Sequence, residues 1–356
     1  MKPSVSVIFI TYNQDKYVSQ AIDSFLMQKT DFDFEILIHD DASTDETVEI
    51  IKRYEKENPK LIKVYLEKEN QHSKANLEFL DRMFRDAKGK YIALCEGDDY
   101  WTDPLKLQKQ FNFMEKNPSY GLCFHPVRVF FESGEEEDTI FPDNSMGNKF
   151  TVKSVIERNP IQTNSVFYRK QKYDDLKSGV IPNDLYLHLY HASYGKIGYI
   201  EEVMADYRRH SGGLWWDKYK QADKIYINHH IQLTAFYERV LSMFSDDKEI
   251  VDIVNNHLIH LFDKFTDVDI KNNTAIVESV SEKYPKLISR YMLEIRKRYK
   301  ELGKERTRID NDLSEVTDAY KNSQKQLHDI VESRSYKLSS SLTQITKPIR
   351  SLKKQK

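Results

Sequence analysis

Two adjacent carboxylates, Asp98 and Asp99, follow the apolar segment 91–95 after only Glu96 and Gly97. An apolar segment that ends abruptly in acids is typical of a buried strand that reaches the edge of a sheet. Ligands bind beyond the carboxyl ends of strands in open α/β sheets. Carboxylate oxygens are ligands that Mg²⁺ and Mn²⁺ prefer, so a divalent ion held here could bridge the phosphates of a nucleotide. Taken alone, such a pair is more often a solvated turn.

Polar residues also follow two other apolar segments, 5–10 and 34–38, which predict buried strands. These residues are Thr11, Tyr12 and Asn13 after the first segment and His39, Asp40 and Asp41 after the second. The carboxyl ends of parallel strands lie along one edge of a sheet, so we expect the three polar ends to converge. That convergence is a stronger signal than any single motif.

The strands that carry these polar ends alternate with helices along the chain. The expected strands are 5–10, 34–38, 61–66 and 91–95, and the expected helices between them are 17–27, 45–58 and 75–87. Strands that alternate with helices predict an α/β fold with a largely parallel sheet. Further on, segment 121–131 is expected to form one long strand with His125 as a structural histidine, and segment 159–168 to lead into another strand.

Three segments of the chain, VSVIFITYN, HDDASTDET and CEGDDYW, resemble the family-2 glycosyltransferases in their order and separation. The resemblance covers about the first two thirds of the chain and is firmest up to Pro104. It implies the GT-A fold, a Rossmann-like and mostly parallel sheet flanked by helices. It also implies an enzyme that uses a nucleotide sugar and, like most of the family, inverts the anomeric centre.

The resemblance assigns a first group of residues to the nucleotide. These residues are Thr11, Tyr12, Asn13, Asp41, Lys74 and Asp98. Tyr12 would stack on or flank the base, Asp41 would accept a hydrogen bond from the base or ribose, and Lys74 would contact a phosphate. A helix-capping turn is the structural alternative for Asp41, and a solvated helix start is the alternative for Lys74.

The resemblance gives the metal site to Asp99 and to His210, which lies in a Tyr-Arg-x-His-x-Gly motif. Mn²⁺ or Mg²⁺ is the implied cofactor, because release of a nucleoside diphosphate builds up charge that a cation neutralises. The Arg of the motif can pair with phosphate. The glycines and tryptophans of segment 212–216 suit a loop that folds over the donor.

The catalytic base of the family is an acid at the start of a helix in the second half of the domain, and Asp184 fits this position. Such a base removes the proton of the acceptor hydroxyl during in-line attack. The family more often carries Glu-Asp here, and Asn183 departs from that pattern, although Asp184 keeps the carboxylate. A simple helix-capping residue is the structural alternative.

Three further residues are expected near the sugar or the acceptor: Trp101, Thr163 and Asn164. An indole face packs well against the C–H face of a sugar ring, which makes Trp101 a candidate for the sugar contact. Core packing is the structural alternative for this tryptophan.

The chain changes character from about Asp217, where strand-like segments end and 225–243 and 250–265 predict amphipathic helices. The organisation we expect has four parts. They are a GT-A catalytic domain over 1–215, a helical extension over 216–285, a coiled coil over 286–332 and a basic tail over 333–356.

A heptad pattern supports the coiled coil. Its seam positions alternate in spacings of four and three and are Ile288, Met292, Ile295, Tyr299, Leu302, Arg306, Ile309, Leu313, Val316, Tyr320, Ser323, Leu327 and Ile330. Only Arg306 and Ser323 are polar. A seam sustained over this length predicts self-association, most simply as a parallel homodimer. A helix packed on the catalytic domain of the same chain is the alternative.

Composition limits the setting of the protein. The 356 residues carry a net charge of −2 and two cysteines, and no apolar segment approaches the ~18 residues of a membrane-spanning helix. No signal peptide is apparent, so we expect a cytoplasmic location. The tail has no acid after Glu332 and suits a peripheral contact with an anionic surface at the inner face of the cell membrane. Nucleic acid is not expected as a partner.

These features predict a metal-dependent, inverting hexosyltransferase. A nucleoside-diphosphate sugar, most simply a UDP-sugar, would be the donor, and a hydroxyl of a saccharide or lipid-linked saccharide would be the acceptor, in cell-surface polysaccharide or glycoconjugate synthesis. A nucleotidyltransferase is one alternative. It usually carries a Gly-rich loop with Arg and Lys after its first strand, where this chain has Thr-Tyr-Asn-Gln-Asp. An inactive scaffold organised by the coiled coil is the other alternative.

Overall fold

The computed structural model describes residues 2–71, 78–134, 136–143, 145, 147–173, 182–211, 213, 230–272, 275–283 and 285–332. The chain divides into two compact units, Met1–Lys283 and Tyr284–Lys356. The first unit contains two sheets and the helices up to α10 (Ala275–Lys283), and the described part of the second unit is the long helix α11 (Pro285–Glu332).

The first unit is built around a seven-stranded sheet in the order β10-β6-β9-β4-β1-β2-β3. Its strands are β1 (Val5–Thr11), β2 (Phe34–Asp40), β3 (Ile62–Leu66), β4 (Tyr91–Glu96), β6 (Tyr120–Phe124), β9 (Phe167–Arg169) and β10 (Lys196–Tyr199). Strands β4, β1, β2 and β3 are parallel neighbours, and β9 runs antiparallel to both β4 and β6. This topology confirms the predicted α/β class with a mostly parallel sheet.

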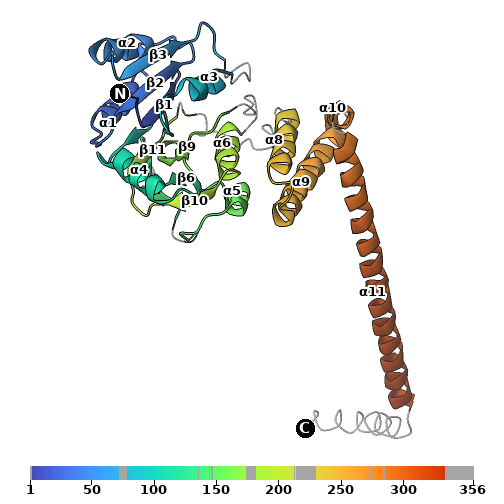
Figure 1. The fold of residues 1–356 in the computed structure, drawn as a ribbon. Coiled ribbons are helices and arrows are strands. Elements are labelled where there is room, and N and C mark those ends of the chain that lie inside the picture. Colours follow the sequence, from blue (N-terminus) through green and yellow to red (C-terminus); the bar gives the residue numbers. More distant parts are fainter. Residues whose placement is uncertain are drawn as a thin grey trace, which may run out of the picture. The chain divides into compact units, whose positions relative to one another are not determined.

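Helices cover both faces of the sheet. Figure 1 shows α1 (Val18–Leu26), α2 (Thr47–Glu57) and α4 (Lys106–Lys116) on one side, and α3 (Glu78–Asp86) and α6 (Asn183–Ala192) on the other. Side chains alternate between the two faces along a strand. Phe9 therefore packs on Phe25 of α1, with ring centroids 5.2 Å apart. On the opposite face Phe84 of α3 lies 6.4 Å from Tyr168 of β9.

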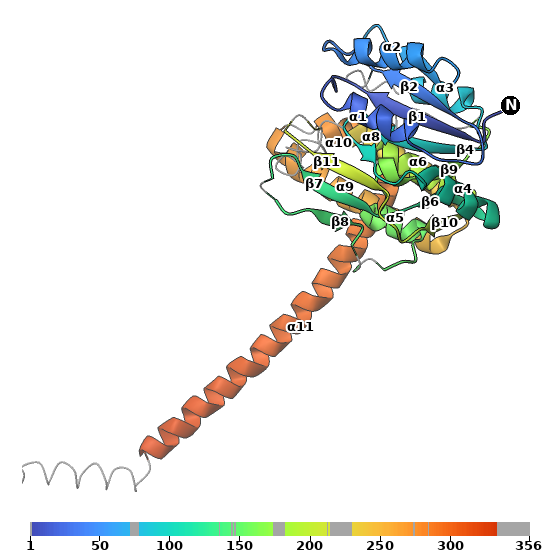
Figure 2. The ribbon, with the colours of Figure 1, turned by 90° about the vertical axis from the view of Figure 1, so that its left-hand side faces the viewer.

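A second, four-stranded sheet has the order β5-β11-β7-β8 and brings distant segments together. Its strands are β5 (Tyr100–Trp101), β7 (Val127–Phe131), β8 (Thr139–Phe141) and β11 (Ala205–Arg209). Figure 2 shows β11, β7 and β8 grouped beside one another. Strand β11 is antiparallel to β5 and parallel to β7.

The expectation of one long strand over 121–131 was wrong. The chain leaves the large sheet after Phe124, passes through His125 and Pro126, and enters the small sheet at Val127. Proline has no N–H for a strand ladder and restricts the residue before it, so the strand cannot continue through this pair. His125 is buried, and its Nδ1 lies 2.9 Å from the carbonyl oxygen of Pro126, which fits the structural role expected for it.

Among the described residues of the first unit are four further helices, α5 (Val152–Arg158), α8 (His230–Met243), α9 (Lys248–Asn272) and α10. Helix α8 contacts α6 and α9, and α9 also contacts α5 and α10. Phe236 and Val240 of α8 and Val254 and Leu258 of α9 are buried in these contacts. Helices α8, α9 and α10 confirm the α-helical region predicted after the α/β part of the chain.

Helix α11 is a single helix of 48 residues and carries the predicted heptad seam on its surface. Its apolar seam side chains from Tyr299 to Ile330 are well exposed, with Leu302 at 60%, Ile309 at 58% and Leu313 at 63%. A coiled coil needs a second helix, so the pairing stays a prediction. Among the helices that the structure describes, none combines the length and apolar character needed to cross a membrane.

Candidate active site

The polar ends of three strands lie at one edge of the large sheet, as predicted. The register of β1 against β2 places Thr11 opposite Asp40, and the register of β1 against β4 places Ile10 opposite Glu96. The backbone N–H of Asp41 donates to the carbonyl oxygen of Thr11 across 3.0 Å. The loops that follow β1, β2 and β4 therefore start side by side.

The loop after β1 has one anchored residue and one exposed residue. Asn13 adopts a left-handed conformation, with φ of 51°. Its N–H donates to Ser43 Oγ across 2.8 Å, and its Oδ1 accepts from the N–H of Thr44 across 2.8 Å. Tyr12 is 44% exposed, so its ring is available to a ligand. Asn13 thus acts by joining two loops, which leaves Tyr12 as the candidate for contact with a base.

Thr11 is buried and lies under the turn that precedes the acid pair. A Cβ added at Gly97 would lie 2.6 Å from Thr11 Oγ1, so only glycine fits at this position. Glycine is required here because the side chains of Thr11 and Gln14 lie against its Cα, rather than because of a positive φ. The close packing brings the loop after β4 against the end of β1.

The two acids after β2 have different surroundings. Asp40 accepts hydrogen bonds from Ser43, from its N–H at 2.9 Å and from its hydroxyl at 2.5 Å, and burial raises the pKa of this carboxyl. Asp40 is therefore a turn residue. Asp41 is buried and accepts a hydrogen bond from the N–H of Gln71 across 2.7 Å. Lys74 lies outside the described residues.

The acids after β4 form a cluster. Asp99 is 1% exposed, and its pKa is raised well above the usual range by burial and by the charges of Asp98 and Glu96. One oxygen of Asp99 accepts the backbone N–H of Arg208 across 2.9 Å. Glu96 is an exposed residue at the end of β4. Desolvation by the surrounding protein and the charges of Asp98 and Asp184 raise the pKa of its carboxyl.

Arg208 of β11 fastens the small sheet to this cluster. Its Nε donates to the carbonyl oxygen of Asp98 across 2.9 Å, and its Nη2 donates to Gln20 Oε1 across 2.7 Å. The guanidinium also lies 4.6 Å from the ring centroid of Tyr17. The Tyr-Arg-x-His-x-Gly motif predicted that Arg208 pairs with a phosphate. In the structure its guanidinium donates its hydrogen bonds to groups of the protein instead.

His210 approaches the acid pair from the end of β11. Its Nε2 lies 3.1 Å from Asp98 Oδ2, and its ring packs on Tyr17 with centroids 4.8 Å apart. In the part of the chain that the structure describes, no three His, Cys, Asp or Glu side chains are arranged to hold a metal ion. Mg²⁺ is usually held by one or two carboxylates together with substrate phosphates, and the oxygens of Asp98 and Asp99 fit that type of site.

Asp184 lies in the first turn of α6. Its Oδ2 accepts a hydrogen bond from Asn159 Nδ2 across 3.2 Å, and burial raises its pKa. Because the charge of Asp184 also raises the pKa of Glu96, the two carboxylates lie within electrostatic reach of each other. Asp184 therefore lies within electrostatic reach of the last residue of β4, and its role as the base stays a prediction.

The role of Asn159 was missed by the sequence interpretation. This residue is the C-cap of α5 and adopts a left-handed conformation with φ of 35°. Asparagine is among the residues that tolerate this conformation at a helix end, and proline often follows shortly after. The sequence Asn-Pro at 159–160 carries that signal, which would have placed Asn159 at the end of a helix.

The expected sugar contact of Trp101 is contradicted by its position. Trp101 is 1% exposed, its Nε1 donates to the carbonyl oxygen of Asn164, and its ring packs on Phe25 with centroids 4.6 Å apart. Asn164 is also buried and donates through Nδ2 to the carbonyl oxygen of Asp206. Both residues join the small sheet to its neighbours, Trp101 of β5 by packing on α1 and Asn164 by its bonds to Trp101 and to β11. Thr163 beside them is partly exposed and stays a prediction for the acceptor side.

Comparison with known proteins identifies the family. The family model described as Glycosyl transferase family 2 matches residues 6–175. An uncharacterized glycosyltransferase of Methanocaldococcus jannaschii is 30% identical over 213 residues, which cover 58% of this chain and 71% of that protein. The chain belongs to glycosyl transferase family 2, as its three sequence motifs predicted, and is therefore a glycosyltransferase.

Two further relatives extend the comparison. An uncharacterized protein of Mycobacterium tuberculosis is 43% identical over 251 residues, which cover 70% of this chain and 71% of that protein. TuaG of Bacillus subtilis, a glycosyltransferase assigned provisionally to teichuronic acid biosynthesis, is 39% identical over 113 residues, which cover 32% of this chain and 42% of that protein.

A solved structure supports the fold. TarS 1–349 of S. aureus, in complex with UDP-GlcNAc, matches with a TM-score of 0.54 and 17% sequence identity over 80% of this chain and 79% of that chain. At this identity the likeness concerns the fold alone. It confirms the predicted GT-A class, a mostly parallel sheet flanked by helices and followed by a helical region.

Proposed function

We propose that this glycosyltransferase is inverting and transfers a hexosyl group from a nucleoside-diphosphate sugar to a hydroxyl acceptor. The observation that carries the proposal is the convergence of the polar ends of β1, β2 and β4 at one edge of the large sheet, where His210 Nε2 lies 3.1 Å from Asp98 Oδ2. This edge gathers the carboxylates suited to bind the nucleoside and the diphosphate. The UDP-GlcNAc bound to TarS makes a UDP-sugar our first choice of donor.

In this proposal the donor lies along the carboxyl edge of β1, β2 and β4. The exposed ring of Tyr12 stacks on the base, and the carboxylate of Asp41 accepts a hydrogen bond from the nucleoside. Asp99, with Asp98 beside it, would hold Mn²⁺ or Mg²⁺, which when bound neutralises the diphosphate leaving group. His210 fixes the carboxylate of Asp98 in its orientation.

Asp184 acts as the base. It accepts the proton of the acceptor hydroxyl while the oxygen forms a bond to the anomeric carbon and the bond from that carbon to the diphosphate breaks. Attack from the side opposite the leaving group inverts the anomeric centre. Burial raises the pKa of Asp184, which makes its carboxylate a stronger base than an exposed aspartate. The amide of Asn159 keeps the carboxylate in position.

The acceptor we propose is a saccharide or lipid-linked saccharide in the synthesis of a cell-surface polysaccharide. The relative provisionally assigned to teichuronic acid biosynthesis supports this class of acceptor. The seam of α11 supports a homodimer. The basic tail 333–356, which lies outside the described residues, would bring the enzyme to an anionic membrane surface.

The test is a screen of nucleotide sugars for turnover and for thermal stabilisation with Mn²⁺ or Mg²⁺. We expect Asp99→Asn to lose both turnover and stabilisation by the donor, and Asp184→Asn to lose turnover but keep stabilisation. Asp31→Asn, an exposed aspartate after α1, is the matched control and should behave like the wild type. If no nucleotide sugar stabilises the protein with either metal, the inactive scaffold becomes the better explanation.

A further inference from the structure

A second site lies at the opposite edge of the large sheet. A cavity of about 680 Å³ opens where β1 and β4 begin and β9 ends, between Lys2, Gly89 and Arg169. The acids of the candidate active site follow the other ends of β1 and β4. A strand of six residues such as β4 spans about 20 Å, so a ligand in this cavity cannot reach the donor site.

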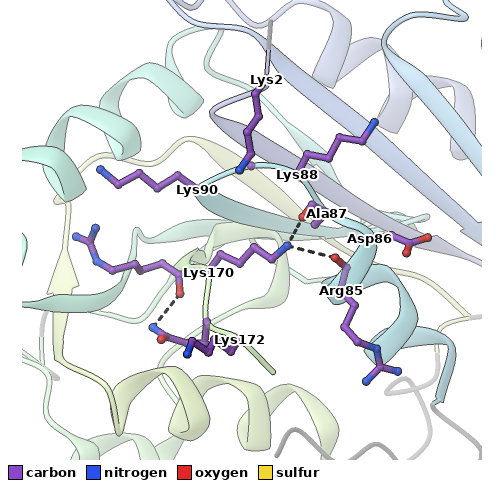
Figure 3. A pocket seen from close by; sticks show the side chains of 11 residues that line it. Lys2, Arg85, Asp86, Ala87, Lys88, Lys90, Lys170 and Lys172 are labelled. Carbon is purple, nitrogen blue, oxygen red and sulfur yellow. Dashed lines mark hydrogen bonds between the residues drawn. The ribbon is translucent and has the colours of Figure 1, made fainter. Parts of the chain in front are cut away.

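The cavity is strongly basic. Seven of its eleven lining residues are Lys or Arg, and Asp86 is the one acid among them. Besides Arg169, the basic residues are Lys2, Arg85, Lys88, Lys90, Lys170 and Lys172. Figure 3 shows Lys2 pointing from the N-terminal segment toward Lys170, with Lys88 and Lys90 on either side of Lys2. These residues come from three separate segments of the chain, residue 2, residues 85–90 and residues 169–172, so the fold brings the positive charges together.

Some of these cations already have partners. Lys90 pairs with Glu115 at 2.5 Å, and Lys88 lies 3.9 Å from Glu35. Lys170 donates to the carbonyl oxygens of Ala87 and Arg85, at the carboxyl end of α3. Carbonyl groups at the end of a helix are common acceptors for lysine, so Lys170 has a structural role in the wall of the cavity.

Other cations have no partner of opposite charge. The side chains of Lys2, Arg85 and Lys172 make no hydrogen bond or ion pair within the described part of the chain. Burial and the positive charge of Lys2 both lower the pKa of Lys170, so the cations of the cavity repel one another. An anion between these side chains would relieve that repulsion, and a tetrahedral phosphate matches the donors of both Lys and Arg.

We propose that this cavity binds a phosphate-bearing ligand that carries two or more negative charges. Its volume admits a diphosphate or a phosphate ester larger than a single phosphate ion. The same chemistry is offered by a soluble phosphate ester and by the headgroup of an anionic lipid. The proposal does not depend on the catalytic mechanism, because the cavity lies at the edge of the sheet away from the active site.

The full chain is titrated with sodium pyrophosphate by calorimetry at low ionic strength, in EDTA and without nucleotide sugar. We expect Lys2→Glu with Lys172→Glu to weaken binding by about tenfold or more, because two exposed cations become anions. The matched control is Lys52→Glu with Lys56→Glu on α2, which makes the same change of net charge at exposed positions away from the cavity. The control should bind like the wild type.

Flotation with vesicles distinguishes the two sources of phosphate. Vesicles of phosphatidic acid, whose headgroup is a phosphate monoester, with phosphatidylcholine are compared with vesicles of phosphatidylcholine alone, with the same three proteins. Sensitivity to the cavity variant with pyrophosphate alone identifies a soluble ester, and sensitivity with anionic vesicles identifies a lipid headgroup. The proposal is overturned if the cavity variant and the control behave alike with both probes. Turnover of the cavity variant should stay at the wild-type level, which separates this test from that of the proposed catalytic mechanism.

Discussion

The side-chain amide of Asn159 donates to Asp184 across 3.2 Å, so the end of helix α5 holds a carboxylate at the start of helix α6. We expect Asn159→Gly to lower kcat by about tenfold, because a hydrogen bond to a charged group is lost while glycine keeps the left-handed backbone. The hydrogen bond lowers the pKa of Asp184, so its loss raises that pKa. The acid limb of the pH–rate profile should then move to higher pH.

Steady-state kinetics over a range of pH provide the measurement for this variant. Asn148→Gly is the matched control, since Asn148 also donates its amide to a carboxylate, that of Glu201, but on the exposed surface. An unchanged pH profile in Asn159→Gly would show that Asn159 does not position the base.

Tyr12 tests the proposed position of the nucleotide base. Its ring is 44% exposed, so Tyr12→Ala should leave the melting temperature nearly unchanged. Stacking of a base on an aromatic ring contributes roughly 1–3 kcal/mol, so donor affinity should fall by about five- to a hundredfold. Tyr12→Phe keeps the stacking face and should bind the donor like the wild type. Equal affinity of all three proteins in calorimetry would place the base elsewhere.

His39 makes the fold sensitive to acid. It is fully buried and stacks on Phe79 with ring centroids 3.8 Å apart, and burial lowers its pKa to about 4. Between pH 6.5 and 4 the unfolded chain therefore takes up a proton at this site that the folded chain does not. Folding stability is lost as the pH falls through this window, by about 2 kcal/mol between pH 7 and pH 5.

Replacement by phenylalanine keeps the stack with Phe79 and removes the titrating group. We expect His39→Phe to lose about 2 kcal/mol less stability than the wild type between pH 7 and pH 5, as measured by urea unfolding. Glu67, which lies 3.5 Å from the imidazole, keeps Arg82 as its partner in this variant. Parallel loss of stability in both proteins would mean that other groups cause the acid sensitivity.

The exposed seam of α11 predicts a dimer. Leu302→Asp with Ile309→Asp should give a monomer in analytical ultracentrifugation, because two apolar layers of the seam become charged. Lys304→Asp with Arg308→Asp, at exposed positions outside the seam, should remain a dimer. A wild-type monomer at micromolar concentration would contradict the prediction.

The orientation of the two helices can be tested separately. Ser323 lies on the seam, so Ser323→Cys should form an intermolecular disulfide in a parallel dimer, where the same position of both helices meets. Cys95 and Cys123 are buried and should not compete for this reaction. A dimer that forms no disulfide in this variant would be antiparallel.

The sequence was most informative where local patterns determine structure. Apolar segments that end in polar or acidic residues identified the carboxyl ends of β1, β2 and β4, because strand burial and polar edges are both visible over a few residues. The convergence of the polar ends of β1, β2 and β4 at one edge required only the topology of a parallel sheet.

Long-range contacts could not be predicted in the same way. The buried position of Trp101 depends on Asn164, 63 residues away, and the hydrogen bond to Asp99 comes from Arg208, 109 residues away. The periodicity of apolar residues along a strand or helix does not indicate which distant residues will contact each other. The break at His125 and Pro126 was overlooked because the apolar pattern continues on both sides, although the proline itself carried the signal.

The bond between the backbone of Arg208 and Asp99 also has a consequence for biosynthesis. The ribosome synthesises Asp98 and Asp99 long before it synthesises β11. A nascent chain therefore contains these two carboxylates before the strand that fixes the orientation of Asp99 has been made. Catalytic competence should therefore arise late in translation, and a premature stop before β11 should yield a protein unable to act on its donor.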